Sequence, residues 1–394
     1  MAQAFLPVRF FLGFKQRVAI MGVSMQEVSI PLFRPVISEQ AIAAVADVLR
    51  SGWLGTGPET GAFESALAEY LGAPFCVGLN SGTAALHLSL QLLDLPAGAE
   101  VITTPITFVA TNHAILQANC RPVFADIQMK TGNLDVAAVK GRISENTGAI
   151  MLVHYGGYPC DIDEFYALGG ERGIPIVEDC AHACGAAYKG RRIGSHGDLH
   201  AFSFQAVKNL STGDGGAIAL RSPEYRRRLQ RLRWLGIDSE THQRQKNGNY
   251  DWQYTVVETG YKAAMNDVQA AIGLAQLRLL DAENARRASI AAQYRAGLAG
   301  IAGLEPLQYL DDRTSSYHLF CVLVDQRDAL AAKLRAAGIS TGVHYQRNDM
   351  FPMYEKYNLP NAERFWRSAL SLPMHLMLTD DQVGYICDAI RKGW

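Results

Sequence analysis

FSFQAVKNLSTGDGGAIAL (residues 202–220) places Lys208 between two apolar runs that are joined by a glycine-rich turn. Lysine rarely occurs inside such a frame unless it is paired or functional. Burial and a nearby cation would lower the pKa of Lys208 and make its amine a usable nucleophile. The competing interpretation is a lysine that extends its charged end to water from a strand end. Ser203 and the glycines would also suit contacts to a phosphate group.

Around this stretch, short apolar runs alternate with helical patterns. Strands are predicted at 75–80, 100–105, 121–127, 149–156, 175–181, 199–205 and 215–220. Helices are predicted at 83–95, 108–119, 161–173 and 222–236. This alternation is typical of an α/β fold with a mostly parallel central sheet and helices on both of its faces.

The pattern changes character in the C-terminal third. Residues 265–298 predict one long helix, and a strand–helix–strand unit follows at 318–325, 328–338 and 339–345. We therefore expect an N-terminal extension at 1–27, a large α/β domain at 28–279 and a smaller α+β domain at 280–394. The polar segment 237–259 is the best candidate for a mobile loop.

Charge and composition exclude several classes of function. The 394 residues carry a formal net charge of −1 and no basic excess for nucleic acid or an anionic membrane. No apolar run is long enough for a membrane span. The seven cysteines are scattered and form no CxxC pair, as expected of reduced thiols in the cytoplasm and not of a zinc site. His196 and His200 are four apart, but Gly197 and Asp198 between them favour a turn, so no metal is expected.

Asp179 lies towards the carboxyl end of the predicted strand PIVEDCA (175–181), at the edge where open α/β sheets place ligand chemistry. A buried carboxylate there needs a cationic partner, and the pyridinium nitrogen of pyridoxal phosphate is one. An aspartate that caps the following turn is an equally good explanation of the residue alone. His182, three residues later, is either a core histidine or a contact to the ring oxygen of that cofactor.

NSGTAAL (80–86) falls where a strand ends and a helix begins. Ser81 suits an N-cap, Gly82 lets the backbone approach a ligand, and the free N–H groups of the helix suit a phosphate. An ordinary helix cap is the commoner meaning of such a sequence. Phe108 begins the next helix at the same edge and would stack on a flat ring, although a core phenylalanine is the default interpretation.

As a set, NSGTAAL, TPITFVAT (104–111), VEDCAHACGA (177–186) and FSFQAVKNLSTGDGGAIAL closely resemble the DegT/DnrJ/EryC1/StrS aminotransferases. These are the sugar aminotransferases among the fold-type I pyridoxal-phosphate (PLP) enzymes. The resemblance extends from about residue 28 to the C-terminus. It implies an aspartate-aminotransferase-like large domain and a homodimer with shared active sites.

The resemblance also implies a role for each candidate residue. Lys208 would form a Schiff base with PLP and move the proton during transfer, and Asp179 would hold the pyridinium nitrogen. Further cofactor contacts would come from His182 on the ring oxygen, Phe108 on the ring face, and Gly82, Thr83 and Ser203 on the phosphate. Many members read GYNYRM where this chain reads GYKAAM (260–265), so Lys262 stands where their Asn reaches the partner's cofactor phosphate.

The implied reaction moves an amino group, from glutamate as the usual donor, to a keto sugar carried on a nucleotide, as in polysaccharide biosynthesis. Two alternatives remain: a PLP-dependent sugar dehydratase, which would carry His in place of Lys208, and a non-catalytic regulatory homologue, which would lack the Lys or the Asp. The basic cluster of Arg226, Arg227, Arg228, Arg231 and Arg233 is either a solvated helix face or a contact to the nucleotide diphosphate.

Overall fold

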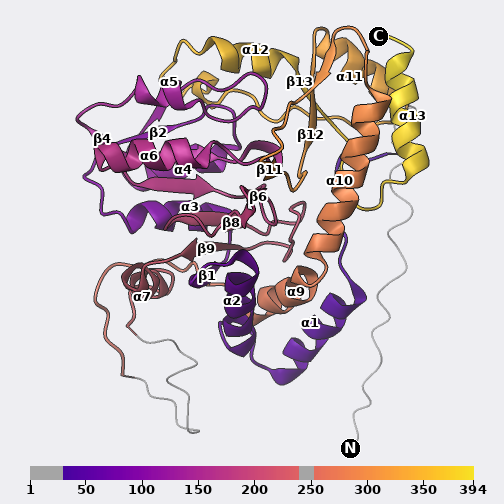
Figure 1. Cartoon of the computed structure of the whole chain (residues 1–394). Helices are drawn as coiled ribbons and strands as arrows, with labels where there is room; N and C mark the ends of the chain where they lie inside the picture. Colours follow the sequence, from indigo (N-terminus) through magenta and orange to yellow (C-terminus); the bar gives the residue numbers. More distant parts are fainter. Residues whose placement is uncertain (1–29, 239–252) are drawn as a thin grey trace, which may run out of the picture.

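A computed structural model describes residues 30–238 and 253–394, and a seven-stranded sheet lies at its centre (Figure 1). The strands are β1 (Phe75–Leu79), β2 (Glu100–Thr103), β3 (Arg121–Phe124), β4 (Thr147–Val153), β5 (Ile176–Asp179), β8 (His200–Ser203) and β9 (Gly216–Leu220). Their order is β1-β9-β8-β5-β4-β2-β3. The four pairings from β8 to β3 are parallel, and β9 is antiparallel to both of its neighbours. The predicted α/β fold with a mostly parallel sheet is confirmed.

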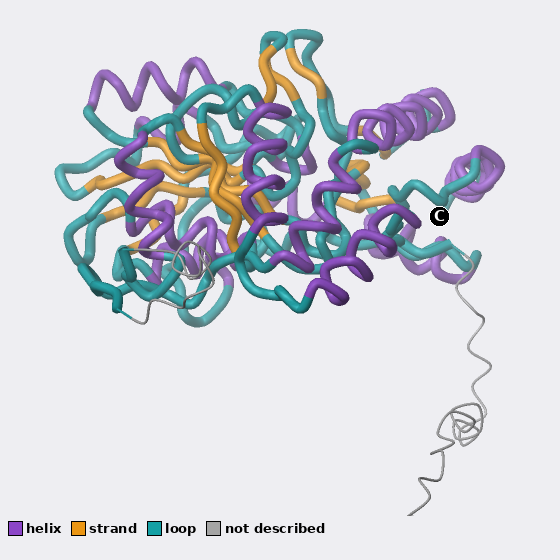
Figure 2. The backbone as a smooth tube through the Cα atoms, turned by 90° about the horizontal axis from the view of Figure 1, so that it is seen from below, coloured by secondary structure: helices purple, strands orange, loops and turns teal. Residues whose placement is uncertain are grey.

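Helices cover both faces of this sheet (Figure 2), which explains why almost all of its residues are buried. They are α2 (Pro58–Leu71), α3 (Gly82–Gln91), α4 (Val109–Gln117), α5 (Val136–Lys140), α6 (Ile162–Arg172), α7 (Pro223–Leu232) and α9 (Asp267–Leu277). The strands contribute fully buried side chains to the core on each face, for example Val77 and Ile218 on one and Ile150 and Leu152 on another. The carboxyl ends of β5 and β8 meet at one edge, together with the N-termini of α3 and α4.

A second, three-stranded sheet in the order β10-β12-β13 lies in the C-terminal part of the chain (Figure 1). Its elements are β10 (Leu304–Pro306), β12 (Phe320–Val324) and β13 (Ala369–Leu372), with α10 (Leu280–Gly297), α11 (Arg327–Ala336), α12 (Pro360–Ser368) and α13 (Asp380–Arg391). Phe320, Leu330 and Ile386 share a core there, which Ile30 joins from the start of the described chain. We propose that this second sheet and its helices form the smaller domain from about residue 280.

Two predictions for the C-terminal third are wrong. The single helix over 265–298 is two helices, because α9 ends in a turn in which Leu279 N–H bonds Gln276 O at 3.0 Å. Asp281 and Glu283 then lie in the first turn of α10, as suits a new helix N-terminus. The strand predicted at 339–345 is reduced to isolated bridges from Ile339 and Gly342, and β13 takes the place beside β12.

The remaining elements are short, apart from α1 (Glu39–Ser51), which packs against α9. β6 (Ala187–Tyr188), β7 (Arg191–Arg192) and β11 (Arg313–Thr314) form a third sheet, and η1 (Tyr155–Gly157) and η2 (Asn348–Met350) are single 3₁₀ turns. The N-terminal extension and most of the predicted mobile loop lie outside the described residues. Among the described helices, none has both the length and the apolar character needed to cross a bilayer.

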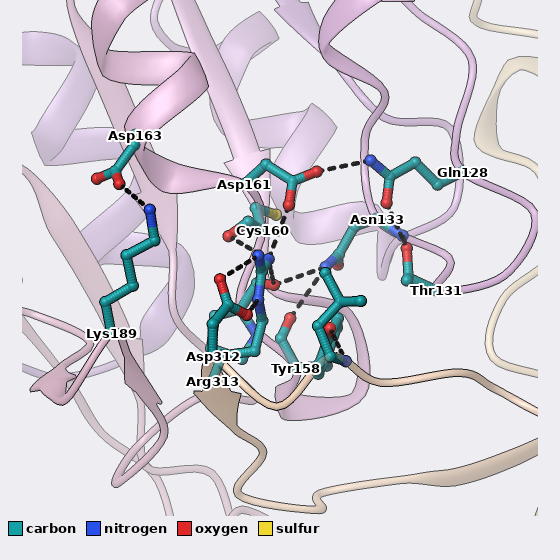
Figure 3. A network of polar contacts seen from close by, with 12 residues as sticks. Gln128, Thr131, Asn133, Tyr158, Cys160, Asp161, Asp163, Lys189, Asp312 and Arg313 are labelled. Carbon is teal, nitrogen blue, oxygen red and sulfur yellow. Dashed lines mark hydrogen bonds and ion pairs between the residues drawn. The ribbon is translucent and has the colours of Figure 1, made fainter.

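Arg313 connects the C-terminal part to the central sheet (Figure 3). Its guanidinium donates to the carbonyls of Pro159 and Cys160 at 3.1 and 3.0 Å and to Asp161 Oδ1 at 2.8 Å. Gln128 donates to the other oxygen of Asp161 at 2.7 Å. A buried guanidinium with this many acceptors fixes how the two parts meet.

Asp267 caps a helix that is distant in sequence. The N-cap of α2 is Gly57, which has no side chain to accept the free N–H groups. Asp267, only 2% exposed, accepts instead from the N–H groups of Gly57 and Thr60 at 2.8 and 2.9 Å and from the Thr60 hydroxyl at 2.7 Å. The carboxylate therefore holds α2 against α9.

We expect Asp267→Ala to lower the free energy of unfolding by about 2–4 kcal/mol, because several buried donors lose a charged acceptor. Urea unfolding followed by circular dichroism measures the change. Asp328→Ala removes a carboxylate whose side chain is 91% exposed and should leave the midpoint nearly unchanged. Equal urea midpoints for the two variants would show that capping of α2 by Asp267 does not stabilise the fold.

Candidate active site

A pocket of about 380 Å³ opens at the edge where β5 and β8 end. Seven of the eight residues predicted from the sequence line it: Gly82, Thr83, Phe108, Asp179, His182, Ser203 and Lys208. They come from the N-termini of α3 and α4, the ends of β5 and β8, and the loops that follow those strands. One cavity is therefore lined by residues that are up to 126 positions apart in the sequence, Gly82 to Lys208.

Lys208 and Asp179 are the charged pair of this pocket. Lys208 lies on the loop between β8 and β9, and Asp179 is the last residue of β5. Burial lowers the pKa of the Lys208 amine to about 8, and the attraction of Asp179 opposes that shift. A lysine with such a pKa has an appreciable fraction of free amine near neutral pH, which is what a nucleophilic lysine requires.

The Asp179 carboxylate is 3% exposed and has protein donors on both oxygens. Oδ1 accepts the Ala181 N–H at 3.0 Å, and Oδ2 accepts the Thr111 hydroxyl at 2.7 Å. Burial raises the pKa of Asp179, and the hydrogen bonds from Thr111 and Ala181 and the charge of Lys208 oppose that rise. Thr111 belongs to the quoted TFVAT run but was not among the predicted site residues.

The N-terminus of α3 forms a cradle beside Ser203. Ser81 caps the helix by accepting the Ala84 N–H at 3.1 Å. A Cβ at Gly82 would lie 2.6 Å from the Ser203 Cβ, so only glycine permits this approach of strand end and helix. Free N–H groups at a helix N-terminus, with a serine hydroxyl opposite, suit a phosphate.

His182 lies in an aromatic wall of the pocket. Its ring stacks on His318 with centroids 4.3 Å apart, and its Nε2 is 3.1 Å from the Tyr345 hydroxyl. Burial holds the pKa of both histidines well below the usual value, so both rings are neutral near pH 7. The buried Nδ1 of His182 has no hydrogen-bond partner among the described residues, which leaves it for a ligand.

Phe108 is 58% exposed although it is large and apolar. Its ring lies 6.2 Å from that of Tyr345 at the pocket mouth. An exposed aromatic at a pocket mouth is better explained by a flat ligand than by the core. Tyr345 and His318 come from the C-terminal part and were not among the predicted site residues.

Lys262 is the predicted residue that does not line this pocket. Its ammonium lies 3.3 Å from the centroid of the Trp234 ring, and its carbonyl accepts from Asn80 Nδ2 at 3.1 Å. Lys262 therefore lies next to the start of α3, but its ammonium group points to Trp234 of its own chain. The expected role concerned the partner subunit's cofactor, so it stays a proposal.

The basic cluster on α7 is largely paired within the protein. Arg228 bonds Asp94 Oδ1 at 2.7 Å, Arg231 bonds Glu258 Oε1 at 3.0 Å, and the buried Arg233 bonds Glu64. This pairing favours a structural role for these arginines over contacts to a nucleotide.

A second polar cluster surrounds Glu178 of β5. Ligand atoms of His154, Glu178 and Cys180 are within 4.8 Å of one another. The Glu178 carboxylate, however, is already 2.8 Å from His154 Nε2, 3.1 Å from His200 Nε2 and 2.6 Å from the Tyr166 hydroxyl. We interpret the cluster as a hydrogen-bonded network that stabilises one buried charge.

With this geometry established, comparisons with known proteins decide the family. A model of the DegT/DnrJ/EryC1/StrS aminotransferase family matches residues 35–391. The chain belongs to this family. It is 37% identical to the spore coat polysaccharide biosynthesis protein SpsC of Bacillus subtilis over 375 residues, 92% of this chain and 96% of SpsC.

Solved structures agree. The sugar aminotransferase CalS13 from Micromonospora echinospora is 36% identical, with a TM-score of 0.86 over 93% of this chain and 100% of its own. Spr1654 from Streptococcus pneumoniae, a candidate sugar aminotransferase solved in its PLP-form, is 33% identical with a TM-score of 0.85 over 92% and 98%. The protein is a PLP-dependent sugar aminotransferase. Its pocket fits PLP: a cradle for phosphate, an amine, a buried carboxylate and an unpartnered His182 nitrogen.

We expect the capture of PLP by the apoenzyme to become faster as the pH rises through about 8, because only the unprotonated Lys208 amine can attack. Stopped-flow absorbance of the visible band between pH 6.5 and 10 measures the rate. Lys208→Ala is the control and should give no band. A rate that is still rising tenfold per pH unit at pH 10, as the ordinary lysine pKa of about 10.4 would give, would contradict the effect of burial.

Proposed function

We propose that this enzyme transfers an amino group from glutamate to a nucleotide-linked keto sugar. The observation that carries the proposal is the pairing of Lys208 and Asp179 in one pocket at the strand ends. The resemblance to CalS13 and SpsC supports a sugar acceptor and, for SpsC, a polysaccharide pathway. A pocket of about 380 Å³ is in the usual range for a small-molecule site.

Each of the predicted residues then has a defined role. PLP, when bound, supplies an electron sink that the protein itself lacks. Lys208 binds the cofactor covalently and afterwards carries a proton between cofactor and substrate carbon atoms. Asp179 keeps the pyridinium nitrogen protonated, and His182 contacts the ring oxygen.

The phosphate and the ring face are held by the remaining residues. Gly82, Thr83 and Ser203 would bind the phosphate, since they surround the N-terminus of α3. Phe108 would cover one face of the ring. Lys208 argues against the dehydratase alternative, and the presence of both Lys208 and Asp179 argues against a non-catalytic homologue.

We also propose a homodimer whose sites are shared. Among the exposed large apolar side chains are Ile42 and Leu49 on α1, and Leu54, Leu235, Val256 and Val257. Exposed apolar surface on this scale usually marks a protein interface. All seven cysteines are buried free thiols, which supports a reducing compartment such as the cytoplasm.

Glutamate should bleach the visible band of the holoenzyme and release one equivalent of 2-oxoglutarate, because the amino group is stored on the cofactor. Adding a nucleotide-linked keto sugar should restore the band and give the amino sugar, with ¹⁵N from labelled glutamate recovered in the product. Lys208→Ala should give neither reaction. Loss of a sugar hydroxyl without ¹⁵N in the product would establish a dehydratase instead.

Hybrid dimers test whether Lys262 serves the partner's site. We expect Lys262→Ala to weaken PLP binding, since one cation near the phosphate is lost. Mixing Lys208→Ala with Lys262→Ala subunits should then restore about a quarter of wild-type sites, because half of the dimers are hybrids with one intact site each.

The controls for this mixture are the two variants alone, each refolded in the same way. Full activity of Lys262→Ala alone would show that Lys262 has no cofactor role. A Lys262→Ala defect that mixing does not repair would place that role within its own chain.

A further inference from the structure

A chain of two hydroxyl groups ends on the Asp179 carboxylate. The Thr111 Oγ1 lies 2.7 Å from Asp179 Oδ2, and the Thr107 Oγ1 lies 2.8 Å from the Thr111 Oγ1. All three residues are buried, with exposed fractions of 2% for Thr107, 1% for Thr111 and 3% for Asp179. No solvent therefore competes for these hydrogen bonds.

The direction of the chain follows from the inventory of donors. An ionised carboxylate only accepts, so the single hydroxyl proton of Thr111 is donated to Asp179. Thr111 can then only accept from Thr107, whose proton is donated inward. The Thr107 hydroxyl thus donates to Thr111, and the Thr111 hydroxyl donates to Asp179 Oδ2. The hydrogen bond from Thr107 polarises the Thr111 hydroxyl and strengthens its bond to the carboxylate.

The position of Thr111 gives this chain a structural meaning. Thr111 is in the first turn of α4, three residues after Phe108, and Asp179 ends β5. The hydrogen bond therefore fixes α4 against β5 just where the pocket opens. The first turn of α4 would then set both the position of Phe108 over the PLP ring and the orientation of the Asp179 carboxylate.

We infer that Thr111 is a positioning residue that orients the Asp179 carboxylate toward the pyridinium nitrogen of PLP and keeps it ionised, with Thr107 supporting it. The inference rests on the proposed role of Asp179. Burial raises the pKa of that acid, and among the contacts that oppose the rise the Thr111 hydrogen bond acts most strongly. Ala181 N–H, Lys208 and His154 lower it further, and Tyr345 is the other titratable group coupled to it.

Thr111→Val keeps the shape of the side chain and removes the donor. The chain offers a matched control in Thr103→Val on β2, because Thr103 is 0% exposed and its hydroxyl has no partner among the described residues. Thr111→Ser keeps the donor and should behave as wild type. Thr107→Val should give a smaller effect in the same direction.

Four measurements on holoenzyme test the inference. We expect Thr111→Val to weaken PLP binding about tenfold or more, the loss typical of a hydrogen bond to a charged group. The ¹⁵N chemical shift of ring-labelled PLP should move toward the unprotonated nitrogen. The pH midpoint of the visible band should rise, because a neutral ring no longer repels the proton on the imine nitrogen, and kcat should fall more than KM changes.

Asp179→Asn separates the inference from the function that it rests on. If Asp179→Asn shifts the ¹⁵N signal and the band while Thr111→Val matches Thr103→Val, Thr111 is not a positioning residue and the role of Asp179 stands. If Asp179→Asn matches wild type, the role of Asp179 and the inference fail together. If Thr111→Val does not fold, Thr107→Val and Thr111→Ser test the inference in its place. Wild-type behaviour of Thr107→Val would then contradict the inferred hydrogen-bond chain.

Discussion

The site is organised by the need to hold one carboxylate, Asp179, out of water without losing its charge. Burying an unpaired carboxylate is costly, and the fold offsets that cost with an N–H group, a hydroxyl and the nearby Lys208. Each of these partners comes from a different element. The end of β5, the start of α4 and the loop after β8 are thus required to meet at one point, and the pocket is the space between them.

The local parts of this arrangement could be predicted from the sequence. Lys208, Asp179 and Gly82 lie in short motifs where a strand end, a helix cap or a glycine turn has a meaning of its own, and all three line the pocket. The parallel sheet was predictable for the same reason, since apolar runs alternating with amphipathic ones have few other solutions.

The long-range parts were not predictable, because nothing local records them. The contact between Tyr345 and His182 joins residues 163 positions apart, and the one between Asn209 and His318 joins residues 109 apart. The split between α9 and α10 was missed because the apolar period continues across Arg278 and Leu279. The separation shows only in the packing, because α9 contacts α1 and α2 whereas α10 contacts α13.

These long-range contacts give the C-terminal part of the chain a direct part in the site. Asn209, next to Lys208, donates to Asn284 on α10 at 2.8 Å and to the Ser316 carbonyl at 2.7 Å. Its oxygen must then accept from His318 Nδ1, 3.2 Å away, which fixes the tautomer of the ring stacked on His182. Asn209 thus joins the loop that carries Lys208 to α10 and to His318, so any shift of this C-terminal part would move His318 and Lys208 together. The contacts that join the two parts of the chain therefore also fix the position of Lys208 relative to the stacked rings of His182 and His318.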